Sequence, residues 1–203
     1  MPLEALLAVT AQESRSNECI VIGEDLGTVP PNFREQLADW GLWSYQVLVF
    51  ERGPDGAFRA PQDFAQNALV AFSTHDLATF AGWTSGHDLQ VKHSIGIDPG
   101  ETEEERQQAR AALHAGLAAQ GIAGDDFLAV AKYLAKTPAR LLVVAMEDVL
   151  VIRDQPNLPG TIRKHPNWLR RLPGALEDLG TNETLGSIAK LMQAAGRGLK
   201  TPA

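Results

Sequence analysis

Cysteine is almost absent from this 203-residue sequence, which contains only Cys19. A single cysteine cannot form an intrachain disulfide, so a disulfide-stabilised secreted fold is excluded and we expect a cytoplasmic protein. Because Cys19 lies in an apolar run, we predict a buried structural thiol. The sequence also lacks a Cys pair and a His-x-x-x-His pair, so it predicts no zinc site.

Long apolar runs and basic clusters are scarce as well. No apolar stretch approaches the ~20 residues that a membrane-spanning helix needs. The formal net charge is −7, and the longest basic clusters are the pairs Arg163-Lys164 and Arg170-Arg171. Binding to nucleic-acid phosphates requires a basic surface. We therefore expect neither a membrane nor a nucleic acid as a partner.

The residues that are present alternate between short apolar runs and helical patterns. Four short, mainly apolar runs, at 19–22, 45–50, 68–72 and 141–146, predict strands. Between them lie helix signals, among which Thr102 and Glu105 have the spacing of a capping box. Alternation of this kind implies right-handed crossovers and a parallel sheet.

Two α/β architectures fit this alternation. Four strands with their helices make half of an eight-fold barrel, for which ~250 residues is typical. The alternative is a small open doubly wound sheet. The sequence favours the barrel, because no glycine-rich phosphate fingerprint follows any predicted strand.

Polar residues follow three of the four predicted strands at the point where each strand ends. These are Glu24-Asp25, His75-Asp76 and Glu147-Asp148. The carboxyl ends of parallel strands converge on the active site in barrels and open α/β sheets. Glycoside chemistry uses a carboxylic acid to protonate the departing oxygen and, in retaining enzymes, a carboxylate to attack the anomeric carbon. The pattern equally fits carboxylates that cap helices or pair with arginine, and we expect such structural roles for Asp25 and Asp148.

A Ser-His-Asp triad fits less well than glycoside chemistry. His75 and Asp76 are neighbours in the sequence, whereas the members of a triad come from separate places in a chain. No Gly-x-Ser-x-Gly elbow is present either.

Three segments resemble those of the 4-α-glucanotransferases (amylomaltases), which are (β/α)8 barrels of the α-amylase-like clan. Residues 21–30 (Val-Ile-Gly-Glu-Asp-Leu-Gly-Thr-Val-Pro) resemble the stretch that bears the family's acid/base glutamate. Residues 73–77 (Ser-Thr-His-Asp-Leu) resemble its Thr-His-Asp motif. Residues 157–161 (Asn-Leu-Pro-Gly-Thr) with 165–168 (His-Pro-Asn-Trp) resemble a loop that separates this family from maltooligosyltrehalose synthases.

The resemblance implies roles for individual residues. Glu24 would be the general acid/base, and Asp76 would stabilise the transition state. His75 and Asn157 would bind substrate hydroxyls, and no cofactor would be needed. Two tryptophans, Trp83 and Trp168, either stack on sugar rings or pack within the fold.

The resemblance also implies a fold and a partner. It implies strands five to eight of the barrel, forming the C-terminal half of one catalytic domain over residues 1–203. A helical insertion is expected at about 87–124, and a C-terminal loop and helix at about 153–196. The family's nucleophile belongs to an Arg-x-Asp-His motif, which the sequence lacks. We therefore expect α-1,4-glucan as substrate, together with a separate N-terminal half or self-association through the strands at 20–22 and 141–146.

Two rival functions follow from the same residues. One is an enzyme similar to maltooligosyltrehalose synthase, which shares the Glu-Asp-Leu-Gly sequence. The other is a noncatalytic fragment that binds glucan or assembles with another chain.

Overall fold

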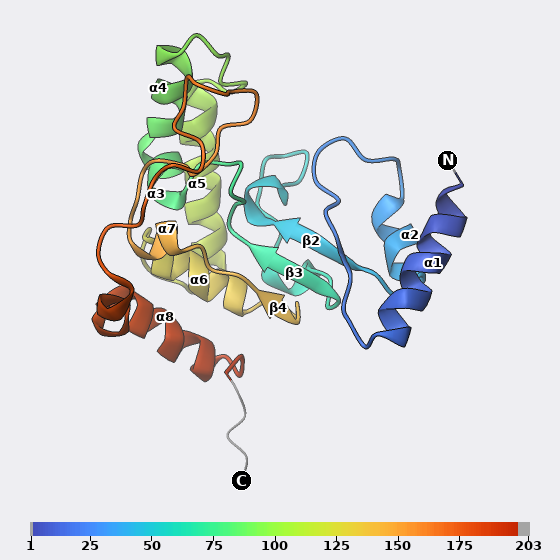
Figure 1. Cartoon of the computed structure of the whole chain (residues 1–203). Coiled ribbons are helices and arrows are strands. Elements are labelled where there is room, and N and C mark those ends of the chain that lie inside the picture. The colour runs from blue at the N-terminus through green and yellow to red at the C-terminus, as the bar shows by residue number, and fades with distance from the viewer. Residues whose placement is uncertain (1, 199–203) are drawn as a thin grey trace.

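A computed structural model describes residues 2–198. It has an α/β fold with a parallel four-stranded sheet in the sequential order β1-β2-β3-β4 (Figure 1). The strands are β1 (Ile22–Gly23), β2 (Trp43–Val47), β3 (Ala68–Ala71) and β4 (Leu141–Leu142). The predicted parallel sheet is therefore confirmed. Within the described residues it is open, with β1 and β4 as its two edges.

Both edge strands are shorter than their apolar runs predicted. Cys19 and Ile20 are exposed and precede β1, so the prediction of a buried thiol is wrong. Their run connects helix α1 to the sheet and lies at its open edge, where apolar character alone does not ensure burial. At the other edge the strand ends at Leu142, and Val143 is exposed.

The helices occupy most of the segments that the sequence indicated. They are α1 (Leu3–Ser16), α2 (Phe33–Asp39), α3 (Phe80–Ser85), α4 (His87–Ser94), α5 (Glu103–Ala119), α6 (Phe127–Ala135), α7 (Met146–Val149) and α8 (Glu183–Ala194), with 3-10 turns η1 (Leu48–Phe50), η2 (Pro61–Asp63) and η3 (Leu176–Thr181). The capping box predicted at Thr102 and Glu105 opens α5, and the Asp126 side chain caps α6. The predicted strand at 45–50 instead ends at Val47, where η1 begins. No helix within residues 2–198 combines the length and apolar character that a membrane crossing needs.

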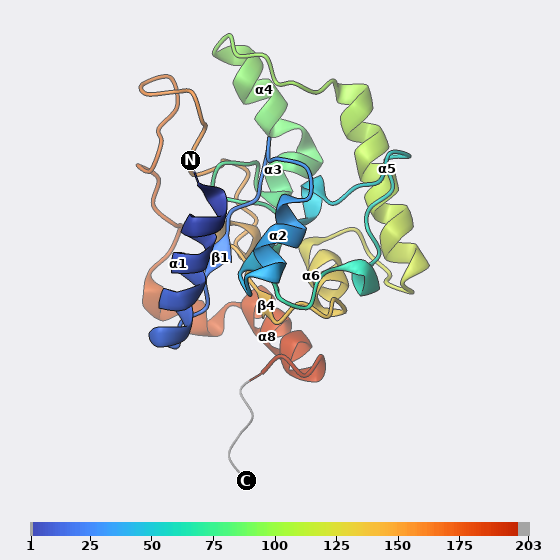
Figure 2. The same cartoon turned by 90° about the vertical axis from the view of Figure 1, so that its right-hand side faces the viewer.

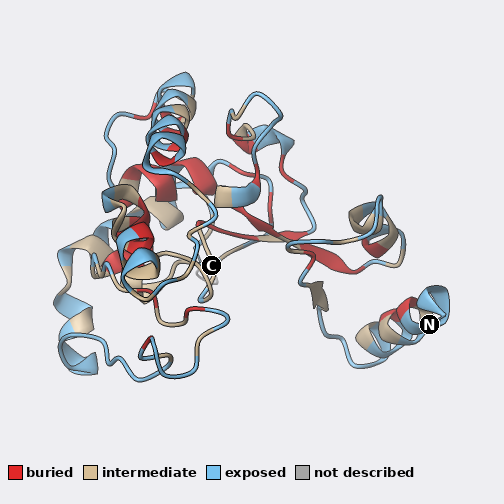
Figure 3. Cartoon of the chain, turned by 90° about the horizontal axis from the view of Figure 1, so that it is seen from above, coloured by how far each residue is buried: buried red, intermediate tan, exposed pale blue. Residues whose placement is uncertain are grey.

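The hydrophobic core lies on one side of the molecule. The larger cluster joins β3 to α5 and α6 through residues such as Val70, Leu113 and Val130. A second, smaller cluster holds α1 and α2 to the sheet edge with only three buried side chains: Leu7, Leu37 and Leu42. Figures 1 and 2 show α1 and α2 beside each other at the β1 end of the sheet, and α6 with α8 at the β4 end. Figure 3 shows the thin burial around the N-terminal helix.

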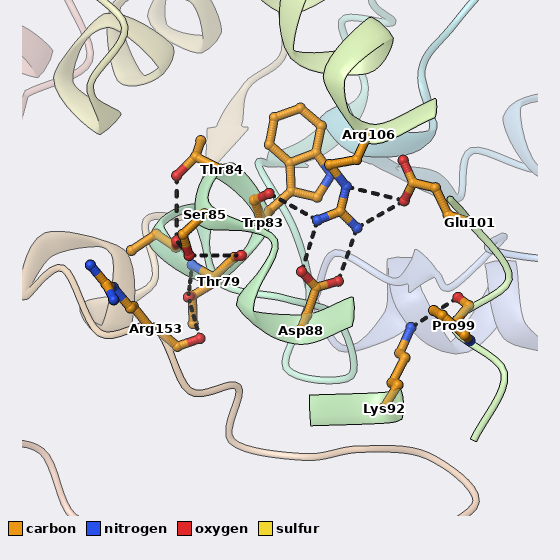
Figure 4. A network of polar contacts seen from close by, with 12 residues as sticks. Thr79, Trp83, Thr84, Ser85, Asp88, Lys92, Pro99, Glu101, Arg106 and Arg153 are labelled. Atoms are coloured by element: carbon orange, nitrogen blue, oxygen red, sulfur yellow. Dashed lines mark hydrogen bonds and ion pairs between the residues drawn. The ribbon is translucent and has the colours of Figure 1, made fainter. Parts of the chain in front are cut away.

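A buried arginine ties the helices after β3 together (Figure 4). Arg106 on α5 donates two hydrogen bonds to Asp88 on α4, at 2.8 and 2.9 Å, and further bonds to Glu101. It also donates to the carbonyl oxygen of Trp83 on α3, and its guanidinium lies 5.3 Å from the centre of the indole ring. Trp83 is 8% exposed, so its ring packs within the fold.

Candidate active site

The carboxylates after β1 have different surroundings. Asp25 is buried and accepts hydrogen bonds from Arg34 Nε at 2.5 Å and from the Tyr45 amide at 2.9 Å. It thereby fixes the backbone after β1 to β2, the structural role expected for it. Glu24 is exposed. Burial raises the pKa of the Tyr45 hydroxyl, and the negative charge of Glu24 raises it further.

The loop after β3 brings three predicted site residues together. Asn157 Nδ2 donates to Asp76 Oδ1 at 2.7 Å, across 81 positions of sequence. His75 Nε2 lies 3.4 Å from the same carboxylate oxygen. The side chains of His75 and Asp76 are 57% and 43% exposed, which leaves them accessible to a ligand. The structure therefore places Asp76, His75 and Asn157 in one polar cluster, which we call the Asp76 cluster.

Gln155 links the backbones of Asp76 and Asn157 and was not identified as a site residue from the sequence. It is buried, and its Nε2 donates to the carbonyl oxygens of Asn157, at 2.6 Å, and Asp76, at 3.4 Å. His165 Nε2 lies 3.0 Å from the carbonyl oxygen of Gln155 and is buried too. A lone glutamine matches no catalytic motif. The only signal was its place at the start of the loop that carries Asn157.

The start of α3 is held by the segment after β4. The Phe80 amide donates to Asp148 Oδ1 at 2.6 Å, and Thr79 Oγ1 donates to the carbonyl oxygen of Ile152 at 2.5 Å. Asp148 is 3% exposed, and burial raises its pKa to about 7. Its structural role was expected from the sequence. Because Thr79 lies three residues after Asp76, these bonds also fix the loop that carries the Asp76 cluster.

Close packing reinforces this attachment. A Cβ atom at Gly82 would lie 2.4 Å from the carbonyl oxygen of Arg153. Only glycine at position 82 therefore allows α3 to pack this closely against the chain after α7. Figure 4 shows Thr79 and Arg153 in contact at this point.

A pocket of about 470 Å³ opens beside Asp76. Its lining includes Asp76, Gln155 and charged residues of both signs, which are Arg52, Lys92, Arg106, Asp88, Glu101 and Glu105. Glu24 does not line this pocket. β2 lies between the strands that precede Glu24 and Asp76, and neighbouring strands are ~4.8 Å apart, so the two strand ends are roughly 10 Å apart along the same edge of the sheet.

This arrangement suits acid–base and hydrogen-bonding chemistry. Carboxyl groups that follow the strands can donate or accept protons, and the His75 and Asn157 side chains can form hydrogen bonds with hydroxyl groups. Glu147, the third predicted carboxylate, is half-buried at the start of α7. Among residues 2–198, no group of three or more His, Cys, Asp or Glu side chains is gathered as a metal site would require.

Comparison with known proteins identifies the family. A family model described as 4-alpha-glucanotransferase matches residues 1–177. The chain is 34% identical over 95% of its length to a 4-alpha-glucanotransferase of Mycobacterium tuberculosis, and 32% identical over 91% to one of Haemophilus influenzae; it covers 29% of each relative. The chain thus spans less than a third of the length of these relatives.

Solved structures agree with the sequence comparison. The amylomaltase of Corynebacterium glutamicum superposes with a TM-score of 0.80 at 28% identity, over 92% of this chain and 30% of that one. The amylomaltase of Streptococcus agalactiae in complex with acarbose superposes with a TM-score of 0.64 at 19% identity, over 97% and 35%, which supports the fold. These matches favour the glucanotransferase interpretation over the synthase. The chain belongs to the 4-alpha-glucanotransferase family.

Proposed function

We propose that this chain supplies the acid/base side and the stabilising side of a 4-alpha-glucanotransferase site that moves α-1,4-glucan segments between maltooligosaccharides. The observation that carries the proposal is the Asp76 cluster. The Thr-His-Asp motif after β3 meets the Asn-Leu-Pro-Gly loop there. This contact lies at the carboxyl ends of the strands, where Glu24 also follows β1. The acarbose complex of the Streptococcus agalactiae relative supports a saccharide as the ligand.

In the proposed reaction Glu24 works twice. It first protonates the glycosidic oxygen that leaves, while a nucleophilic carboxylate attacks the anomeric carbon from the opposite face. It then removes the proton from the acceptor hydroxyl that displaces this carboxylate. The exposure of Glu24 at a strand end allows both transfers. Configuration is retained, and glucan passes to a sugar rather than to water if an acceptor fills the site before water does.

The Asp76 cluster would act on the sugar whose bond breaks. Asp76, oriented by Asn157 and His75, would bind hydroxyl groups and stabilise positive charge as the oxocarbenium-like state forms. Because Asn157 already donates to Asp76 in the free chain, little rearrangement is required on binding.

We further propose that the four strands are strands five to eight of a (β/α)8 barrel, with α4 and α5 in its helical insertion. The open edges at β1 and β4 support this, because unpaired strand edges template association with another chain. A separate N-terminal half, or a second copy of this chain, would cover these edges. The N-terminal half would also supply the nucleophile, for which the chain has no matching Arg-x-Asp-His motif.

Glu24→Gln in the assembled enzyme tests the proposal. Glutamine keeps the shape of the side chain and removes the transferable proton, so disproportionation of maltotriose should fall by ~10²–10⁴-fold. Glu35→Gln is the matched control, because Glu35 is an exposed carboxylate on α2 of the same βα unit. Activity of Glu24→Gln within about threefold of the control would remove Glu24 from the mechanism. Glucan binding without transfer by the assembled protein would favour the noncatalytic fragment.

A further inference from the structure

Trp168 has an unusual combination of backbone and side-chain features. Its φ is 60°, in the left-handed region that glycine adopts freely and that bulky side chains disfavour. The residue is 62% exposed, so burial does not offset that cost. The indole lies 5.2 Å from the His75 ring, centre to centre, at an angle of 48° between the ring planes. Strained residues of this kind cluster at functional sites.

The indole is not what closes the loop. The Trp168 amide donates to the carbonyl oxygen of Pro156 at 3.0 Å, a bond that any residue except proline would make. The Asn167 side chain accepts from the Leu158 amide and donates to the carbonyl oxygen of Thr161, both at 2.9 Å. These bonds hold the loop in place and leave the indole projecting beside the Asp76 cluster. The local fold therefore needs the backbone bend at this position, but it does not need a tryptophan.

We propose that the indole of Trp168 is a specificity-determining platform on which a glucosyl ring of an α-1,4-glucan stacks, next to the sugar held by the Asp76 cluster. This inference rests on the proposed function and deepens it. A pyranose ring presents C–H groups on its faces and hydroxyls at its rim. The electron-rich face of an indole attracts the C–H groups, while polar groups such as His75 and Asp76 hold the rim. Sugar sites combine apolar surface with a few placed polar groups in this way.

The tryptophans of the chain make the platform directly observable. Trp168 is the one exposed tryptophan, because Trp43 and Trp83 are buried and Trp40 is half-buried. Titration of the full chain with maltoheptaose should give a saturable change in tryptophan fluorescence. Cellohexaose, which has the same sugar units joined by β-1,4 bonds, should give none.

Variants separate stacking from packing. Trp168→Ala should weaken maltoheptaose binding by about tenfold or more in calorimetry, since it removes the whole stacking surface. Trp168→Phe keeps an aromatic face, so it should bind within about threefold of the unmodified chain while losing the fluorescence response. Leu169→Ala is the matched control, because Leu169 is 78% exposed and adjacent in the same loop. It should leave binding unchanged.

Several results would overturn the platform: no binding of maltoheptaose, equal binding by Trp168→Ala and the unmodified chain, or an equal loss in Leu169→Ala. The outcome is separable from that of the proposed function. If Glu24→Gln abolishes transfer while Trp168→Ala binds normally, the platform fails and the function stands. If Trp168→Ala weakens binding while Glu24→Gln keeps full transfer activity, the platform stands and the proposed function fails.

Discussion

Asp148 offers the sharpest test of how the site is held together. Its carboxyl is buried, accepts a hydrogen bond from the Phe80 amide, and has a pKa raised to about 7, mainly by burial. Asp148→Asn keeps an oxygen that accepts this hydrogen bond and removes the group that ionises. The substitution therefore isolates the cost of burying the charge.

The raised pKa of Asp148 determines how the free energy of unfolding depends on pH. The folded state holds the Asp148 proton more tightly than the unfolded chain, in which the pKa is near its usual value of 3.8. The stabilisation is therefore complete below pH ~4 and is lost as the pH rises through ~7. A shift of about 3 pKa units corresponds to about 4 kcal/mol, of which ~3 kcal/mol would be lost between pH 5 and pH 8.

Urea denaturation at several pH values measures this loss. The free energy of unfolding of the wild-type chain should fall by about 3 kcal/mol relative to Asp148→Asn between pH 5 and pH 8. Taking the difference between the two proteins cancels the titration of the histidines. Parallel curves for the two proteins across this range would refute the reasoning, because they would show that Asp148 is ionised without penalty in the folded state.

Two further predictions concern the same region of the fold. Asp76→Asn in the assembled enzyme should lower kcat far more than it raises KM, because we propose that the carboxylate stabilises charge that exists only in the transition state. Steady-state kinetics with maltotriose measure both constants. A normal kcat with a raised KM would indicate that Asp76 binds the ground state instead. Val151 has φ 56° and is 67% exposed, so Val151→Gly should raise the free energy of unfolding by about 1 kcal/mol, whereas Val151→Ala, which keeps a Cβ in the left-handed region, should not.

Local signals in the sequence predicted local structure well. The capping box at Thr102 and Glu105 depends on residues within one helical turn, and it forms as expected. The strand at 68–72 was found because β3 lies inside the sheet and its apolar side chains are covered on both faces. The run at 19–22 has the same apolar character, but Cys19 and Ile20 are exposed and Val21 and Ile22 are only half-buried. Burial depends on neighbouring elements, and within the described residues this run packs only against the small cluster of α1 and α2 and pairs with β2 on one side.

Part of the candidate site could be predicted from the sequence and part could not. The polar residues that end the strands could be located from the sequence, because the carboxyl ends of parallel strands share one edge. The contact between Asp76 and Asn157 was not readable from spacing, and only the family resemblance suggested a shared site for them. Gln155 and the bond from Phe80 to Asp148 link segments more than 65 residues apart through single side chains. Contacts of that kind appear only once the fold is known.

The two halves of the proposed machinery differ in how completely this chain builds them. Asp76 is fixed by Asn157 and Gln155, and its loop is anchored to the segment after β4. Glu24 stands exposed after β1, at the edge of the sheet where only a small cluster supports α1 and α2. The stabilising side is therefore preorganised by bonds within the chain. If a further strand pairs with β1, as proposed above, the surroundings of Glu24 would change much more than those of Asp76.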